Sequence, residues 1–180
     1  MKCVMLSIRP QWCEKIASGK KTIEVRKTAP KEVPFKCYIY MTQGTYKDLG
    51  LYSEGIYQNR MKVIGEFICD KVYLIKNQRN RFVVANEEQG VTNEIARQSC
   101  LDYYDMVNYL GDKDGYGWHI SDLKIYDKPK PIMQFYKPCP IKIKNCPVCE
   151  LYSTYTGCCM NNIDRPPQSY MFVEEVQNDN

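Results

Sequence analysis

The stretch that decides the fold is "SGKKTIEVRK", residues 18–27, in which four of the ten residues are Lys or Arg and one is Glu. Its β-branched residues favour a strand, and side chains alternate between the two faces of a strand. The apolar face holds Ile23 and Val25, and the polar face holds Thr22, Glu24 and Arg26. A strand that only filled a core would not carry so polar a face. The sequence therefore raises the question of what that face binds.

The residues before this stretch predict a strand and a short helix. Residues 3–8 are apolar enough for a strand with neighbours on both faces. Pro10 suits the first turn of a helix, and Gly19 suits its end, because a left-handed backbone costs glycine little. The expected inward stripe of this helix consists of Cys13, Ile16 and Ala17.

The rest of the chain predicts more strands than helices. Strands are expected at residues 36–41, 62–75, 116–129 (with a bulge or bend near Ser121–Asp122) and 170–176. Thr92 can cap a helix through about Cys100, and Asp102 can cap a second one ending at Gly111. No regular alternation of strand and helix runs through the chain. This pattern indicates an α+β fold around a small β-barrel or a curled sheet.

Length and composition are those of a globular protein. The chain has 180 residues, 44% of them hydrophobic, and a formal charge of +4, which permits a basic patch without indicating a nucleic-acid coat. No run of about 18 apolar residues exists, so no membrane span is expected. Arg9 and Pro10 interrupt the first apolar segment, which argues against a secretory signal. We therefore expect a cytoplasmic protein.

Two interpretations of the polar strand face stay open. In the first, it is a solvated face with a cross-strand ion pair. In the second, Lys21 and Arg26 hold an anion, while Glu24 accepts a proton or orients a polar ligand. A carboxylate between two cations should stay ionised, which suits hydrogen bonding better than general-acid catalysis.

Residues 19–26 match the pattern G-x-K-x-x-E-x-R of ASCH domains, which are members of the PUA-like β-barrel group. Residues 6–27 resemble the first strand, helix and second strand of these domains. Residues 117–130 and 165–175 resemble the later strands of ASCH proteins that are often found in phages and prophages. The resemblance thus covers most of residues 1–135 and the final strand, and it implies a PUA-like barrel.

The resemblance also implies a function, which is binding of RNA or a nucleotide-like ligand in a cationic cleft. Trp118 could stack on a base, whereas His119, the one histidine of the chain, has a hydrogen-bonded structural role as its alternative. The expected ligand-binding residues are Lys20, Lys21, Thr22, Glu24, Arg26, Trp118 and His119.

Two enzymatic alternatives follow from the same resemblance. A bacterial relative is an amidohydrolase that removes the acetyl group from acetylated cytidine, but its Thr nucleophile is replaced here by Glu24, which cannot perform the same covalent chemistry. Other ASCH proteins resemble ribonucleases, in which Lys21 and Glu24 would act as electrostatic stabiliser and base. A phage-encoded interaction protein is a further alternative.

Five of the ten cysteines crowd into residues 139–159, whereas the others are scattered through apolar segments as small hydrophobes. Cys146 and Cys149 form a C-P-x-C motif typical of a zinc knuckle. Free thiols or a single disulfide are the alternative. The expected ligands of a structural zinc are Cys139, Cys146, Cys149 and Cys158, with Cys159 as an alternative to Cys158.

These predictions divide the chain into three parts. Residues 1–135 together with 165–176 form an ASCH-type barrel with two or three short helices. Residues 136–164 form a Cys-rich insertion that can bind zinc, and residues 177–180 form a frayed tail.

Overall fold

The computed structural model describes residues 1–44, 58–78, 81–84, 89–138 and 162–175. The chain divides into two compact units. The first unit consists of Met1–Pro10, Lys36–Glu66 and Ile125–Asn180, and the second of Gln11–Phe35 and Phe67–Lys124.

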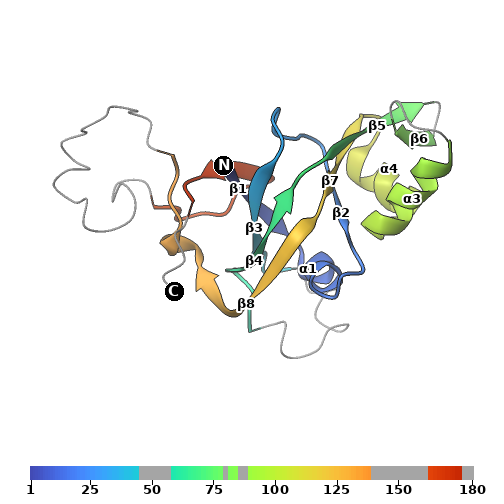
Figure 1. The fold of residues 1–180 in the computed structure, drawn as a ribbon. Coiled ribbons are helices and arrows are strands. Elements are labelled where there is room, and N and C mark those ends of the chain that lie inside the picture. The colour runs from blue at the N-terminus through green and yellow to red at the C-terminus, as the bar shows by residue number, and fades with distance from the viewer. Residues whose placement is uncertain (45–57, 79–80, 85–88, 139–161, 176–180) are drawn as a thin grey trace. The chain divides into compact units, whose positions relative to one another are not determined.

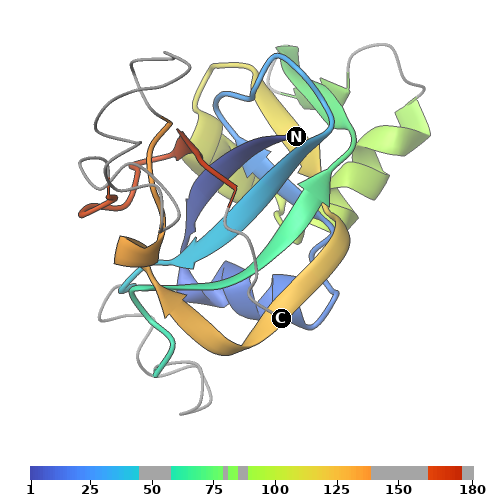
Figure 2. The same ribbon diagram turned by 60° about the vertical axis from the view of Figure 1, so that its left-hand side comes forward.

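A five-stranded sheet has the order β8-β4-β3-β1-β9. Its strands are β1 (Lys2–Ile8), β3 (Phe35–Met41), β4 (Lys62–Cys69), β8 (Ser121–Pro131) and β9 (Tyr170–Val173). Strands β1, β3 and β4 run side by side in Figure 2. The last strand, β9, pairs antiparallel with β1, so that Cys3 lies opposite Val173. The end of the described chain thus returns to its beginning.

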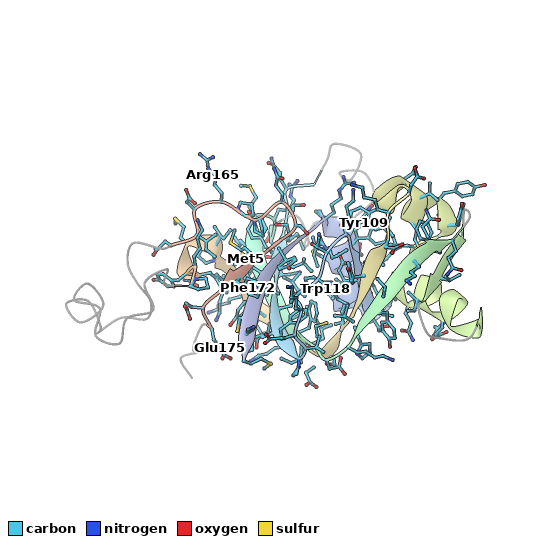
Figure 3. All side chains as sticks on the ribbon, turned by 90° about the horizontal axis from the view of Figure 1, so that it is seen from above. Met5, Tyr109, Trp118, Arg165, Phe172 and Glu175 are labelled. Atoms are coloured by element: carbon cyan, nitrogen blue, oxygen red, sulfur yellow. The ribbon has the colours of Figure 1, made fainter. Side chains whose placement is uncertain are left out.

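The core of the first unit is apolar and aromatic. Phe135 follows the 3-10 turn Ile132–Gln134 and packs edge-on against Tyr38, with ring centroids 4.9 Å apart. Met5 lies in this interior, whereas Arg165 and Glu175 lie at the periphery of the unit (Figure 3). The buried cluster comprises Cys3, Met5, Tyr38, Tyr40, Val63, Phe135, Ile163 and Val173.

The second unit contains an antiparallel sheet of order β2-β7-β5-β6 and two helices that lie together beside it (Figure 1). Its strands are β2 (Ile23–Arg26), β5 (Val72–Gln78), β6 (Arg81–Val84) and β7 (Gly115–His119). Its helices are α3 (Gln89–Ser99) and α4 (Tyr103–Leu110), and α1 (Pro10–Ala17) precedes β2.

Helix α4 packs closely on strand β7. A Cβ atom at Gly115 would lie 2.7 Å from both terminal methyl carbons of Leu110, so a side chain there would force the Leu110 side chain to move. The buried cluster beneath the helices comprises Ile23, Val25, Ile75, Phe82, Ile95, Met106 and Leu110. Val25 and Ile23 thus fill the core from the apolar face of β2, as the alternation predicts.

The α+β class is confirmed, and the structure is barrel-like without closing into one continuous barrel: the described strands form two sheets. Two segments that the sequence predicts as single strands each form two strands in the structure. The segment 62–75 breaks at Asp70–Lys71, and the segment 116–129 breaks at Ile120, just before Asp122 with a φ of 46°. In both cases the two halves belong to different sheets, so the chain must turn between them. The change of apolar parity near Ser121 was the sequence signal for the second break.

The helices agree with the sequence in most details. Helix α1 occupies Pro10–Ala17, and Gly19 has a φ of 73° as expected of a helix end, although Ala17 is exposed instead of buried. Asp102 caps α4 as predicted, since its carboxylate accepts from the Asp105 amide.

Helix α3 begins at Gln89, so the prediction that Thr92 caps it is wrong. The short strand β6 was not predicted.

The predicted Cys-rich insertion and the tail fall mostly or wholly outside the described residues, so the predicted division into barrel, insertion and tail stays a prediction. Within the described residues, no helix has the length and apolar character needed to cross a membrane.

Candidate ligand-binding site

The polar residues of the opening stretch are buried. Strand β2 pairs with β7 so that Glu24 lies opposite Trp118 and Arg26 opposite Tyr116. Lys21, Glu24 and Arg26 are only 2%, 5% and 7% exposed. The interpretation of a solvated strand face is therefore wrong for these three residues.

Glu24 holds the two cations together. Its Oε2 lies 3.3 Å from the Lys21 Nζ, and its Oε1 lies 2.9 Å from an Arg26 guanidinium nitrogen. We call this group the Lys21–Glu24–Arg26 cluster. Two cations and one carboxylate leave one formal positive charge in excess. Burying charge is costly unless it is balanced, so the excess needs a physical reason.

Part of that reason is that Lys21 closes the end of helix α3. Its Nζ donates to the carbonyl of the buried Ser99 across 2.6 Å, and the Thr22 amide donates to the Gln98 carbonyl across 2.9 Å. The last carbonyls of a helix have no partner inside the helix and carry its negative partial charge. Lys21 therefore both satisfies a helix terminus and holds Glu24.

Cys100 completes this helix end. It has a φ of 55°, which is the left-handed conformation that commonly follows a helix, and its thiol donates to the Lys20 carbonyl across 3.3 Å. Residues 98–100 thus dock along residues 20–22 through three hydrogen bonds. This contact fixes the position of Lys21 relative to β2.

Burial shifts the pKa of two groups at the cluster. Desolvation lowers the pKa of Lys21, and the nearby Glu24 carboxylate opposes this shift. Burial also raises the pKa of the fully buried Cys13 thiol, and the negative charge of Glu24 adds to the effect. Cys13 is therefore a neutral thiol in the field of the cluster. Lys21, in contrast, is a cation kept in an unfavourable environment, which is typical of functional sites.

Trp12 is the aromatic residue of the cluster that sequence reasoning missed. The Nζ of Lys21 lies 5.1 Å from the centre of its ring, and the Nζ of Lys15 lies 4.7 Å from it. Both distances fall within the range of cation–π attraction. The signal was present in the sequence, because Trp12 and Lys15 are three residues apart in a predicted helix and so share a face.

The structure does not bring Trp118 or His119 into an open site with the cluster. Trp118 is fully buried and packs edge-on against Phe35, with centroids 5.1 Å apart, so its ring has no face free for stacking. It lies among the other side chains of the second unit in Figure 3. His119 follows Trp118 along β7 and therefore points to the opposite face of the sheet.

His119 instead forms a hydrogen bond with Asp70. Its Nδ1 lies 2.7 Å from the Asp70 Oδ1, and this hydrogen bond lowers the pKa of Asp70. The pair joins the turn between β4 and β5 to the end of β7, which agrees with the structural alternative for this histidine. Of the other two expected ligand-binding residues, Lys20 is exposed and Thr22 is partly exposed.

The five expected zinc ligands, Cys139, Cys146, Cys149, Cys158 and Cys159, lie outside the described residues. In the described ranges, no group of three or more His, Cys, Asp and Glu side chains could hold a metal ion. Cys3, Cys13, Cys37 and Cys69 are buried and form no disulfide, as expected of small hydrophobes.

Comparison with solved structures identifies the fold. The crystal structure of ASCH from Zymomonas mobilis is 17% identical and has a TM-score of 0.58, covering 97% of this chain and 89% of that one. A variant of the same protein with a tyrosine replaced by phenylalanine has a TM-score of 0.57 at 16% identity, covering 97% and 92%. A serine-to-alanine variant has a TM-score of 0.58 at 16% identity, covering 97% and 89%.

The chain has an ASCH fold. No family model and no curated protein matches it by sequence, and identities of 16–17% establish the fold alone. In this ASCH fold, the motif G-x-K-x-x-E-x-R spans the turn after α1 and strand β2. The Lys, Glu and Arg of the motif are the three members of the buried cluster.

Proposed function

We propose that this chain is an ASCH-type module that binds RNA or a nucleotide-like ligand at the Lys21–Glu24–Arg26 cluster. The observation that carries the proposal is the burial of three charged side chains at one place, where Lys21 and Arg26 both contact the Glu24 carboxylate. An anionic group such as a phosphate would balance the excess charge in an environment where electrostatic interactions are strong. The ASCH fold supports the proposal, because the resemblance to this family implies the same ligand class.

The members of the cluster have different tasks in this proposal. Lys21 is 1% exposed in its side chain and is tied to α3, so it positions Glu24. Arg26 keeps 8% of its side chain exposed and presents a guanidinium, whose planar fork suits phosphate. Lys20 and Lys27 are exposed beside the cluster in sequence and can add attraction for a polyanion.

The test is a titration of fluorescently labelled single-stranded RNA with the wild type, Arg26→Gln and Lys128→Gln. Arg26→Gln should bind the RNA about tenfold more weakly or worse, because it loses a charge-assisted hydrogen bond to phosphate. Lys128 is exposed on β8 and is the matched control, because its replacement removes one positive charge without touching the cluster. Equal affinity of all three proteins would refute the proposal. Circular dichroism checks the fold, and Arg26→Lys separates charge from geometry.

A second candidate is an enzyme that acts on RNA or on a modified nucleoside, as a ribonuclease or an amidohydrolase. The observation that favours it is the lowered pKa of the buried Lys21 beside a carboxylate, because such lysines are suited to acid–base chemistry. Long incubation with single-stranded RNA and with acetylated cytidine distinguishes the two candidates. Turnover that is lost in Lys21→Ala and kept in Lys128→Gln would favour the enzyme.

We also propose that the Cys-rich segment binds one structural zinc through Cys146, Cys149 and two of the other three cysteines of that segment. Thiolate sulfur is the donor that zinc prefers in structural sites, and a metal bound by four of these cysteines would constrain the segment between them. Elemental analysis of protein purified under mild conditions should find about one zinc per chain. Folded protein with much less metal would contradict this proposal.

A further inference from the structure

Trp12 places a partly exposed aromatic ring at the Lys21–Glu24–Arg26 cluster. Its ring centre lies 5.1 Å from the Lys21 Nζ, and the same Nζ lies 3.3 Å from the Glu24 carboxylate. The ring and the cluster therefore share one ammonium group. Lys15, three residues along α1, adds a second ammonium 4.7 Å from the ring centre.

The chain has two tryptophans, and they differ in what they can contact. Trp118 is fully buried, whereas Trp12 is partly exposed. Tryptophan is enriched at binding interfaces, because its ring offers a large apolar contact area and its N–H a polar group. Here the surroundings are cationic, so a purely apolar partner would not match them.

A ligand that matches both features carries an aromatic ring and an anionic group close together. Nucleotides have this combination, since every base has a π-face and every nucleotide has a phosphate. We propose that Trp12 stacks on an unpaired base of the ligand whose phosphate is held at the cluster. This inference rests on the proposed function and defines its ligand further.

Two consequences follow from stacking on Trp12. The base must be unpaired and accessible, so the ligand is a mononucleotide or a single strand and not a duplex. Stacking tolerates any base, so the module should discriminate weakly among the four nucleotides unless other groups read the base edge.

The experiment compares ligands with and without a base. Adenosine and cytidine monophosphate are titrated against ribose 5-phosphate, which carries the same phosphate and sugar, into the wild type, Trp12→Leu and Trp12→Phe. Tryptophan emission is recorded together with affinity. We expect the nucleotides to quench the wild-type emission and ribose 5-phosphate to leave it nearly unchanged.

Trp12→Leu should bind the nucleotides about 5- to 150-fold more weakly, as expected for the loss of one base–aromatic stack. It should lose much less affinity for ribose 5-phosphate, which has no base to stack on the ring. Trp12→Phe keeps an aromatic ring and should lose less affinity for the nucleotides than Trp12→Leu. Should Trp12→Leu not fold, the quenching of the wild type and the affinity of Trp12→Phe still test the proposal.

The failures of the two proposals are distinguishable. If nucleotides bind Trp12→Leu as they bind the wild type, while Arg26→Gln is weakened, the stacking inference is wrong and the proposed function stands. If neither nucleotides nor single-stranded RNA bind the wild type, the proposed function itself is wrong.

Discussion

The two units of the molecule each contain a three-residue ionic group, and the two groups differ in both exposure and charge. In the first unit, the Lys36 ammonium lies 2.6 Å from a Glu175 oxygen and 3.9 Å from a Glu66 oxygen, with side-chain exposures of 16%, 45% and 13%. In the second unit, Lys21 and Arg26 share Glu24, and no side chain of the three exceeds 8% exposure. The group around Lys36 has one carboxylate in excess and lies near solvent. The Lys21–Glu24–Arg26 cluster has one cation in excess and lies away from solvent.

This difference indicates for which group solvent explains how the excess charge is balanced. An excess negative charge near solvent is hydrated and costs little. Water can therefore balance the group around Lys36, which ties the end of the chain to strand β3. An excess positive charge in the interior is not balanced in this way. In the proposed function, the anionic group of a ligand complements the Lys21–Glu24–Arg26 cluster.

The largest effect should come from Glu24→Gln. This change removes the carboxylate and leaves two buried cations without an opposite charge, so we expect a loss of about 3–5 kcal/mol in the free energy of unfolding. Urea denaturation measures it. Glu66→Gln is the matched control, and it should cost less, because Lys36 keeps Glu175 as its partner. Similar losses in the two variants would remove the contrast between the groups.

Lys21→Met should have an intermediate effect on the free energy of unfolding, and this effect should depend on pH. The pKa of Lys21 is lowered in the folded state by burial, relative to its ordinary value of 10.5. At a pH between the lowered folded-state pKa and the ordinary pKa, the unfolded state binds more protons than the folded state. Raising the pH in this range therefore stabilises the folded wild type. The free energy of unfolding of the wild type, minus that of Lys21→Met, should thus rise as the pH rises toward 10.5.

Hydrogen exchange is a second test of the Lys21→Met variant. Lys21→Met removes the hydrogen bond to the Ser99 carbonyl, so amides at the C-terminal end of α3 should exchange faster. Amides of α4, whose cap is formed by Asp102, serve as the internal control. A pH-independent difference together with unchanged exchange would contradict the role of Lys21 at the helix end.

The smallest effect should come from Glu175→Gln. The Glu175 side chain is 45% exposed, so solvent screens its ion pair with Lys36. Such exposed pairs contribute about 0–1 kcal/mol. Thermal and urea unfolding should therefore place this variant close to the wild type. A loss as large as that of Glu24→Gln would mean that exposure does not separate the two groups.

The sequence predicted the local elements well where one residue decides them. Asp102 at a helix start, Gly19 at a helix end and the alternation of Ile23 and Val25 each act through the nearest few bonds. The division of 62–75 and 116–129 between two sheets was not predictable in full, because it depends on which distant strand each half pairs with. Only the change of apolar parity near Ser121 indicated a break.

The candidate site shows the same limit. The motif identified Lys21, Glu24 and Arg26, but a strand pattern alone could not reveal that all three are buried, since burial requires neighbours from elsewhere in the chain. The contact of Lys21 with Ser99 joins residues 78 positions apart. Trp118 was expected to stack on a base because it is aromatic, and the fold instead encloses it.

The most direct measurement of the central claim is the unfolding of the wild type and Arg26→Gln with and without a short single-stranded RNA. Without RNA, Arg26→Gln should be close to the wild type in stability, because Lys21 and Glu24 remain as a balanced pair. With RNA, the wild type should be stabilised as a ligand that binds the native state requires, and Arg26→Gln should gain much less. A strongly destabilised Arg26→Gln that gains as much from RNA as the wild type would show that the excess cation serves the fold and not a ligand.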